Sequence, residues 1–279
     1  MGSSGIISLI IILNTCIFSY QGFKNHMIID RYEFNVDKIM LHRQYWRLFS
    51  SCLVHLNWLH LILNMVVLFF FSGSLESQVG PLRFLVIYLM GVAGGNLFAL
   101  LVHRKHGDYG SVGASGAINA VIFATIALVP GKGIGLFFLP ISIPAWLFAI
   151  LFVGYSIYGV RSKRDNVGHE AHLGGALAGI LLALAFYPKA FVENYIPILA
   201  TVVPIGIFIY LIVKSPHILL VDNFFFKKHQ KYTIDQEYNL SRRKKEMQLD
   251  EILDKIQKKG MQSLTREEMK RLKEFSKQL

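Results

Sequence analysis

A serine and a histidine at the starts of two apolar segments could together do hydrolytic chemistry. Ser115 lies in the Gly-Ala-Ser-Gly segment 113–116, and His172 lies at the start of a later apolar segment. A hydroxyl at a helix N-terminus lies beside unsatisfied backbone N–H groups and the positive end of the helix dipole, which would stabilise negative charge developing on an attacked carbonyl. A neutral imidazole could take the hydroxyl proton as a general base. These residues therefore predict hydrolysis of a peptide bond by a dyad of Ser115 and His172.

An oxyanion hole can be assembled from residues of the same region. His60 and Asn64 are four residues apart, so they lie on one face of a helix and can point together. With the backbone N–H groups of Ala114 and Ser115 they would bind the developing oxyanion. Each such donor is typically worth about 2.7–4 kcal/mol in the barrier. The alternative interpretation is that His60 and Asn64 make an ordinary polar contact between helices.

Glycines flank both chemical residues. Gly113 and Gly116 lie around the serine, and Gly175 and Gly179 follow the histidine. Small residues at this spacing let two helices approach closely, which would bring an imidazole within reach of a hydroxyl. The same pattern is compatible with a plain packing surface, in which the serine is only a small residue and the histidine a satisfied core side chain.

Metal binding is the competing chemistry for the histidines. His169 and His172 are three residues apart. With His55 or His60 they could ligate a metal, as in a metalloprotease or a metal transporter. The pattern His-Glu-x-His differs from the His-Glu-x-x-His of zinc proteases. The two histidines are therefore one residue too close to bind zinc as they do in those enzymes. We therefore expect no metal and no cofactor, and we interpret Glu170 as a loop or interfacial acid rather than a third catalytic residue.

The elements that position these residues are apolar segments long enough to span a membrane. The mean hydropathy is +0.43, 53% of the 279 residues are hydrophobic and 17% are charged, which excludes an ordinary soluble globule for most of the chain. A helix rises about 1.5 Å per residue against a hydrocarbon core of about 30 Å. The predicted spans are 5–22, 54–73, 82–102, 115–130, 144–160, 169–188 and 192–214. The aromatic-rich stretch 24–47 is too polar to span and is expected to lie in the interface.

The alternating direction of successive spans brings the polar residues to one face of the membrane. The second, fourth and sixth spans run in the same direction, so their N-terminal ends share one side. His60, Asn64, Ser115 and His172 all lie near those ends. The fourth span would be only about 24 Å long, so its N-terminus should lie below the surface. Irregular backbone at that depth needs protein or a water-filled cavity around it, and such a cavity would admit the water that hydrolysis requires.

Charge and composition divide the chain. We predict a bundle of apolar helices over 1–190, an additional transmembrane or interfacial helix over 191–226, and a soluble basic tail with a helical hairpin over 227–279. The tail carries fifteen Lys and Arg against nine Asp and Glu. The net charge of +11 favours anionic lipid headgroups over nucleic acid, because the basic residues do not form stripes interleaved with aromatic residues. Cys16 and Cys52 are expected to be buried free thiols.

The ordered set of motifs resembles the rhomboid family of intramembrane serine proteases, over about residues 5–188. It is carried by Trp46-Arg47, His55-x4-His60-x3-Asn64, Gly73-x-x-Glu76, the Gly-Ala-Ser-Gly segment 113–116 and Ala171-His172-x-x-Gly175-x3-Gly179. The resemblance implies an all-α polytopic membrane bundle with a six-helix core. It also implies cofactor-free cleavage of single-pass membrane proteins near the bilayer surface, with substrate access beside the second and fifth helices. Glu76 is similar to a structural acid of that family.

The resemblance also assigns roles to residues. In rhomboids the motif serine is the nucleophile and the histidine of the sixth helix is its base, which corresponds to Ser115 and His172. The His and Asn of the second helix help to bind the oxyanion, which corresponds to His60 and Asn64. Many rhomboids have an aromatic residue one turn after the serine, packed against the imidazole. This chain has Asn119 there, whose amide could orient the base by a hydrogen bond.

The expected partners are transmembrane protein substrates and the lipid bilayer, with no nucleic acid and with the partner of the tail left open. The expected location is a bacterial cell (inner) membrane. The resemblance places the site outside the cytoplasm, whereas the charges of the loops argue for the opposite side. Two alternatives stay open: a catalytically inactive rhomboid-like protein that binds membrane helices, and a metal-dependent membrane protease or transporter.

Overall fold

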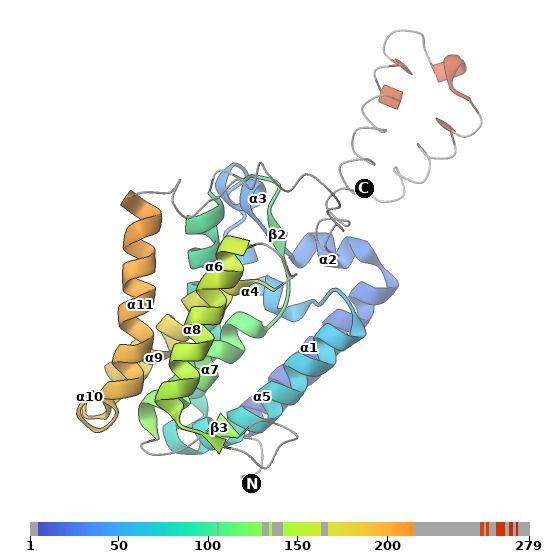
Figure 1. Ribbon diagram of the computed structural model, residues 1–279. Coiled ribbons are helices and arrows are strands. Elements are labelled where there is room, and N and C mark those ends of the chain that lie inside the picture. The colour runs from blue at the N-terminus through green and yellow to red at the C-terminus, as the bar shows by residue number, and fades with distance from the viewer. Residues whose placement is uncertain are drawn as a thin grey trace. The chain divides into compact units, whose positions relative to one another are not determined.

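The structure is a computed structural model that describes residues 5–104, 106–129, 134–135, 142–162 and 167–214, with short pieces between 252 and 272. It divides into two compact units, Met1–Lys227 and Lys228–Leu279, each described here by itself. Helices dominate the first unit (Figure 1). Its helices are α1 (Ile6–Lys24), α2 (His26–Tyr32), α3 (Val36–Met40), α4 (Arg47–Ser50), η1 (Ser51–Leu53), α5 (Trp58–Val79), α6 (Pro81–His103), α7 (Ser115–Leu128), α8 (Ala145–Ser162), α9 (His169–Phe186), α10 (Ala190–Glu193) and α11 (Tyr195–Lys214). Its short strands are β1 (Phe34–Asn35), β2 (Gly110–Ser111), β3 (Ile134–Gly135) and β4 (Ser142–Ile143).

Each of the seven apolar segments expected to span a membrane contains an apolar helix. α1, α5, α6, α9 and the stretch Tyr195–Ile212 of α11 are long and apolar enough to cross it, and α7 and α8 are shorter apolar helices. The prediction of an all-α, multi-pass membrane bundle is therefore confirmed. The protein is an integral membrane protein.

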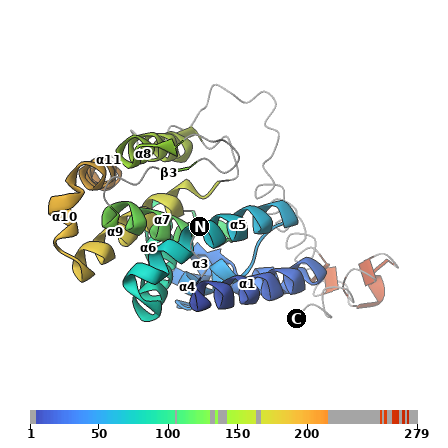
Figure 2. The ribbon, with the colours of Figure 1, turned by 90° about the horizontal axis from the view of Figure 1, so that it is seen from below.

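The central helix of the bundle is α7, with α5, α6 and α9 packed against it (Figure 2). Every residue from Gly116 to Leu128 is buried. The 14 residues of α7 correspond to a length of about 21 Å, which is shorter than a hydrocarbon core of about 30 Å. Because other helices enclose α7, it does not have to match the thickness of the lipid.

Small residues let α7 and α9 touch along their backbones. A Cβ built at Gly175 of α9 would overlap the backbone carbonyl of Gly116 in α7. Gly179 of α9 has the same relation to the carbonyl of Ala120. Gly174, on an adjacent face of α9, packs in this way against Gly94 and Gly95 of α6. These three helices therefore cannot accept larger side chains at the contacts without moving apart.

The bounds of α5 differ from those that the hydropathy predicts. The sequence placed the second span at 54–73, whereas the helix covers Trp58–Val79. Asn57 sets its start, because the side-chain oxygen accepts an N–H of the first turn at 2.8 Å. Gly80, with a φ of +80°, follows its end and makes the turn into α6. The correction moves His55 from the second span into the loop before it.

Glu76, near the end of α5, caps the start of α1. Its two carboxylate oxygens accept the N–H groups of Ile7 at 2.9 Å and Ser8 at 3.0 Å. A carboxylate at a helix N-terminus satisfies donors that have no partner within the helix, and it complements the helix dipole. The bonds join the start of α1 to the end of α5, in keeping with the structural role that the resemblance implied.

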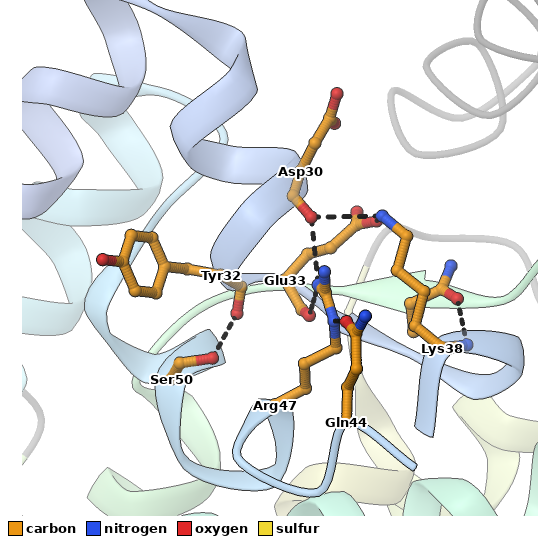
Figure 3. A network of polar contacts seen from close by, with 8 residues as sticks. Asp30, Tyr32, Glu33, Lys38, Gln44, Arg47 and Ser50 are labelled. Atoms are coloured by element: carbon orange, nitrogen blue, oxygen red, sulfur yellow. Dashed lines mark hydrogen bonds and ion pairs between the residues drawn. The ribbon is translucent and has the colours of Figure 1, made fainter. Parts of the chain in front are cut away.

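The interfacial stretch between α1 and α5 is a folded segment rather than a plain linker. Arg47 is buried, and its guanidinium donates to the backbone oxygens of Glu33 at 2.7 Å and Asp30 at 3.0 Å (Figure 3). Its Nε donates to the side-chain oxygen of Gln44 at 2.7 Å. Within this segment, β1 pairs antiparallel with β2, which lies in the loop that leads to α7. The folded segment is therefore joined to the chain that carries Ser115.

The additional helix α11 runs along α8, as both ribbon views show. Residues at alternating intervals of three and four form its buried face, which is the spacing of a helix packing seam. They are Ile198, Thr201, Ile205, Phe208 and Ile212. Just before α11, the amide of Asn194 donates to the backbone oxygen of Ala127 at 3.0 Å, which joins this end of the chain to α7.

In the second unit, the described residues include a reciprocal helix cap. The N–H of Thr265 donates to the carboxylate of Glu268 at 2.7 Å, and the N–H of Glu268 donates to the hydroxyl of Thr265 at 3.3 Å. The bond from Lys255, followed by those from Thr265, lowers the pKa of Glu268 to about 2. Most of the helical hairpin expected over 227–279 lies outside the described residues.

Candidate active site

Ser115 is the first residue of α7 and is half-buried. The chain reaches it through Gly113, whose φ of +121° is rarely adopted by residues with a side chain. A Cβ at Gly113 would also lie 2.8 Å from Cε1 of the His60 ring. The Gly113 N–H donates to the backbone oxygen of Ser51 at 2.9 Å. Gly113 thus makes a tight turn beside the His60 ring. It lies outside the helices, which corrects the helix-packing role that its spacing suggested.

A buried imidazole holds the residue before the serine. The N–H of Ala114 donates to Nε2 of His55 at 3.3 Å, and Nδ1 of that ring lies 3.0 Å from the hydroxyl of Ser19. Because Nε2 accepts, the proton of the neutral ring is on Nδ1 and is donated to Ser19, whose hydroxyl donates to the backbone oxygen of Leu53 at 3.1 Å. Burial, followed by the nearby His60, lowers the pKa of His55 to about 3. The ring is therefore neutral at pH 7.

The residues predicted to bind an oxyanion are near the serine turn but partly engaged. The N–H of Ala114 donates to His55, so a role in binding an oxyanion requires that bond to open. The His60 ring lies against Gly113. Asn64 is buried, its amide nitrogen donates to the backbone oxygen of His60 at 2.9 Å, and its Oδ1 has no hydrogen-bond partner among the described residues. An amide nitrogen has two N–H bonds, so one bond to His60 leaves a second donor.

His172 lies in the first turn of α9 and is half-buried. A Cβ at Gly116 of α7 would lie 3.3 Å from the backbone oxygen of Ala171. The residue after Ser115 and the residue before His172 are therefore close neighbours. The structure brings together the helix turns that carry the two residues.

The ring beside the His172 imidazole comes from α8. Phe152 stacks with it at a centroid distance of 6.2 Å and an interplanar angle of 28°. Asn119, one turn after the serine, donates its amide to the backbone oxygen of Ser115 at 2.8 Å. The predicted role of Asn119 in orienting the base stays a prediction. The sequence gives no signal for Phe152, because it is one of many apolar residues in the run that forms α8.

Asn96 of α6 is a further residue that the sequence analysis missed. It is buried, and its amide donates to the backbone oxygen of Leu48 and to the hydroxyl of Ser51, both at 2.8 Å. The backbone oxygen of Ser51 accepts the N–H of Gly113. Asn96 therefore supports the turn before the serine through the interfacial segment. The available signal was an amide within a long apolar span, where polar side chains are costly unless they are paired.

Glu170 is buried, which corrects its interpretation as a loop or interfacial acid. Its carboxylate lies 2.7 Å from Nε2 of His103 at the end of α6. Tyr109, in the loop toward α7, stacks on the His103 ring at a centroid distance of 3.6 Å. Glu170 and His172 are two residues apart and so point to different sides of α9. The pair of Glu170 and His103 holds the start of α9 to α6.

Among the residues that the structure describes, no group of three or more His, Cys, Asp or Glu side chains is arranged to hold a metal ion. His169 and His172 are in edge-to-face ring contact at a centroid distance of 6.0 Å. Cys16 and Cys52 are both free thiols; Cys52 is buried as predicted, whereas Cys16 is half-buried.

The comparison with protein families decides the family. A sequence model of the rhomboid domain matches residues 42–189, which is more than half of the chain. The chain belongs to the rhomboid family. The matched part of this rhomboid runs from the interfacial segment through α9, so it contains every residue of the candidate site. A second match, over residues 232–278 of the tail, is to a family of unknown function (DUF6576).

The relatives of this rhomboid include mitochondrial and bacterial proteins. RHOMBOID-like protein 12, mitochondrial, of Arabidopsis thaliana is 30% identical over 184 residues, which is 60% of this chain and 54% of that protein. Presenilin-associated rhomboid-like protein A, mitochondrial, of Danio rerio is 35% identical over 47% of this chain and 34% of that protein. The rhomboid protein YdcA of Bacillus subtilis is 30% identical over 52% of this chain and 69% of that protein. The chain thus spans about half or less of the two mitochondrial relatives.

Proposed function

We propose that this rhomboid is an intramembrane serine endopeptidase, with Ser115 as the nucleophile and His172 as its general base. The observation that supports this most is the contact of the first turns of α7 and α9, where Gly116 lies against the backbone of Ala171. A hydroxyl and an imidazole can share a proton only if the turns that carry them adjoin. Membership of a family whose members are in general serine proteases supports the same chemistry.

In the proposed reaction, Oγ of Ser115 attacks the carbonyl carbon of the substrate while His172 takes the hydroxyl proton. The oxyanion of the tetrahedral intermediate accepts hydrogen bonds from His60, Asn64 and the backbone N–H of Ser115. The carbon–nitrogen bond then breaks, and the imidazolium gives its proton to the leaving amine. A water molecule next attacks the acyl carbon with the imidazole as base, which releases the acid and restores the serine. No metal or cofactor takes part.

We infer that the substrates are membrane proteins cut in or near a transmembrane segment, within a lipid bilayer. Exposed apolar side chains on α5 and α8, such as Ile62 and Trp146, support access from the lipid. A bacterial cell membrane stays a prediction for the location, because the relatives include mitochondrial proteins as well as a bacterial one. The partner of the basic tail stays open.

A catalytically inactive protein that binds membrane helices is the second candidate. The bond from the Ala114 N–H to His55 favours it, because that bond occupies one of the predicted oxyanion donors. Such a protein would bind a transmembrane segment without turnover, and its serine would not react with an electrophile.

The two candidates differ in whether Ser115 reacts. The full chain in detergent or lipid would be treated with a fluorophosphonate probe, and cleavage of a reporter transmembrane substrate would be measured beside it. We expect labelling at Ser115 and cleavage in the native protein. Ser115→Ala should abolish the labelling and lower the cleavage rate by about 10³-fold or more, the effect of removing a catalytic nucleophile.

Ser111→Ala, in β2, provides a matched serine control that should keep both activities. His172→Ala should keep the fold and lose both. Undiminished cleavage by Ser115→Ala would rule out the proposed nucleophile. Binding of the reporter without labelling or cleavage of the native protein would favour the inactive alternative.

A further inference from the structure

The imidazole of His172 is in contact with a cluster of aromatic side chains centred on α8. Phe152 stacks with the imidazole at a centroid distance of 6.2 Å. The Phe152 ring also contacts two other rings. The centroid distance is 5.1 Å to Phe123 in α7 and 5.8 Å to Phe148 in α8. Phe123 is fully buried. The ring that touches the imidazole is therefore held in place by the core of the bundle.

α7 has no aromatic side chain one turn after Ser115. The position one turn after the serine is Asn119, and its amide donates to the backbone oxygen of Ser115. Asn119 thus stabilises the first turn of α7, while the aromatic surface beside the imidazole belongs to α8. The ring contact therefore crosses from one helix to another, and its geometry depends on where α8 lies.

Such a contact can hold an imidazole in the orientation that transfers a proton. Rotation about the bond between Cβ and the ring is broad, so packing has to select one orientation of the ring plane. Aromatic rings at centroid distances of 4.5–7 Å have preferred orientations, and the 6.2 Å contact lies in that range. Loss of the ring would let the imidazole turn away from the hydroxyl without removing either group.

We propose that Phe152 is a positioning residue for the base: its ring on α8 fixes the plane of the His172 imidazole for proton transfer with Ser115. The placement of α8 then controls whether the base is correctly oriented. α8 packs against α9 and α11, and Trp146, Ile150 and Leu151 form part of its exposed apolar surface. A substrate helix or lipid that displaces α8 would change the orientation of the base through the ring of Phe152. The inference rests on the proposed function.

Phe152→Leu tests the role directly, with Phe152→Tyr to restore an aromatic ring and Phe148→Leu as the matched control. Phe148 lies one turn earlier on α8, in the same cluster, and its described ring contacts are with Phe123 and Phe152. The measurements are the rate of Ser115 labelling by a fluorophosphonate, kcat and KM for a reporter substrate, and the melting temperature, all on the full chain.

Phe152→Leu should lower both the labelling rate and kcat by about tenfold, the order that an aromatic contact can supply, with KM unchanged. Phe152→Tyr should restore both rates to within about twofold. Phe148→Leu loosens the cluster but keeps the ring that stacks on the imidazole, so it should lower both rates clearly less than Phe152→Leu does. A labelling rate of Phe152→Leu equal to that of the native protein would overturn the proposal. Equal losses in the two leucine variants would also overturn it, because they would indicate general packing.

The same experiment separates this inference from the proposed function. If the native protein reacts and Phe152→Leu reacts equally well, the nucleophile stands and only the positioning role fails. If the native protein does not react with the probe and does not cleave the reporter, the proposed function fails and the positioning role fails with it.

Discussion

At the scale of single residues, His55 shows how a histidine can support the turn that leads to Ser115. It accepts the N–H of Ala114 on one ring nitrogen and donates from the other to Ser19, which fixes both its tautomer and its charge. Protonation would turn the accepting nitrogen into a donor facing an N–H group. The bond that holds the residue before Ser115 therefore exists only while His55 is neutral.

This requirement predicts an acid-sensitive stability. Burial lowers the pKa of His55 in the folded protein from 6.5 to about 3, so protons bind more tightly to the unfolded chain. The stability from the neutral ring is complete above about pH 6.5 and is lost as the pH falls toward 3, by up to about 1.4 kcal/mol per pH unit. His55→Gln keeps an acceptor but cannot titrate, so its melting temperature should fall less between about pH 7 and pH 5.

The exposed His42, replaced by Gln, is the control and should leave the pH dependence as it is in the native protein. A His55→Gln variant whose melting temperature falls as steeply with acid as that of the native protein would contradict the prediction.

The sequence could locate the two residues of the proposed dyad but not the residues that support them. Ser115 and His172 begin apolar segments of the same direction, and such segments can be read from hydropathy alone. Phe152 and Asn96 act across helices, and nothing in a linear sequence says which faces of two helices meet. The sequence does not reveal that Glu170 is buried, because its partner His103 is distant in the chain. The two residues become neighbours only through the packing of α6 and α9.

At the scale of elements, the contact between α7 and α9 depends on glycines that leave no room for a side chain. The prediction is that Gly175→Ala lowers stability by about 1–3 kcal/mol, because the added methyl group meets the backbone carbonyl of Gly116, which cannot rotate away. The cleavage rate should fall with it, since the two turns of the site would move apart. The measurement is unfolding of the full chain in detergent, with cleavage measured in parallel.

Gly154→Ala on α8 is the matched control, because a Cβ at Gly154 has no neighbour within 4 Å. It should be neutral or slightly stabilising, as an alanine favours a helix over a glycine by roughly 0.5–1 kcal/mol. Equal effects of the two substitutions would show that helix propensity, and not the close contact, decides the outcome.

Helix boundaries were harder to predict than helices. The sequence pattern identified each apolar helix, because apolar composition over a long window is a strong signal. The second span was placed too early, since Val54 and His55 border an apolar run that hydropathy cannot divide. The side chain of Asn57 and the left-handed backbone of Gly80 set the limits of α5, and both are local effects.

At the scale of the whole molecule, the helices that face outward differ from the one they enclose. α1 and α5 have 19 and 22 residues and carry many exposed apolar side chains, whereas α7 has 14 residues and is buried. The outer helices correspond to about 29–33 Å, close to the usual hydrocarbon thickness of about 30 Å. Only these outer helices have to match the bilayer.

We therefore expect resistance to unfolding to be greatest in bilayers with a hydrocarbon thickness of about 30 Å, and lower in both thinner and thicker ones. Each ångström of mismatch should cost a fraction of a kcal/mol. Thermal inactivation in phosphatidylcholines of short, medium and long acyl chains would measure this. An optimum near the 21 Å length of α7, or no dependence on thickness, would contradict the expectation.

The bond between Glu76 and the start of α1 bears on the order in which the chain matures during synthesis. The ribosome delivers Ile7 and Ser8 long before it delivers Glu76, yet the N–H groups of the first two are satisfied by the carboxylate of the third. α1 is therefore made before the carboxylate that caps it. The cap can form only once α5 has been made, so the start of α1 and the end of α5 acquire these bonds together.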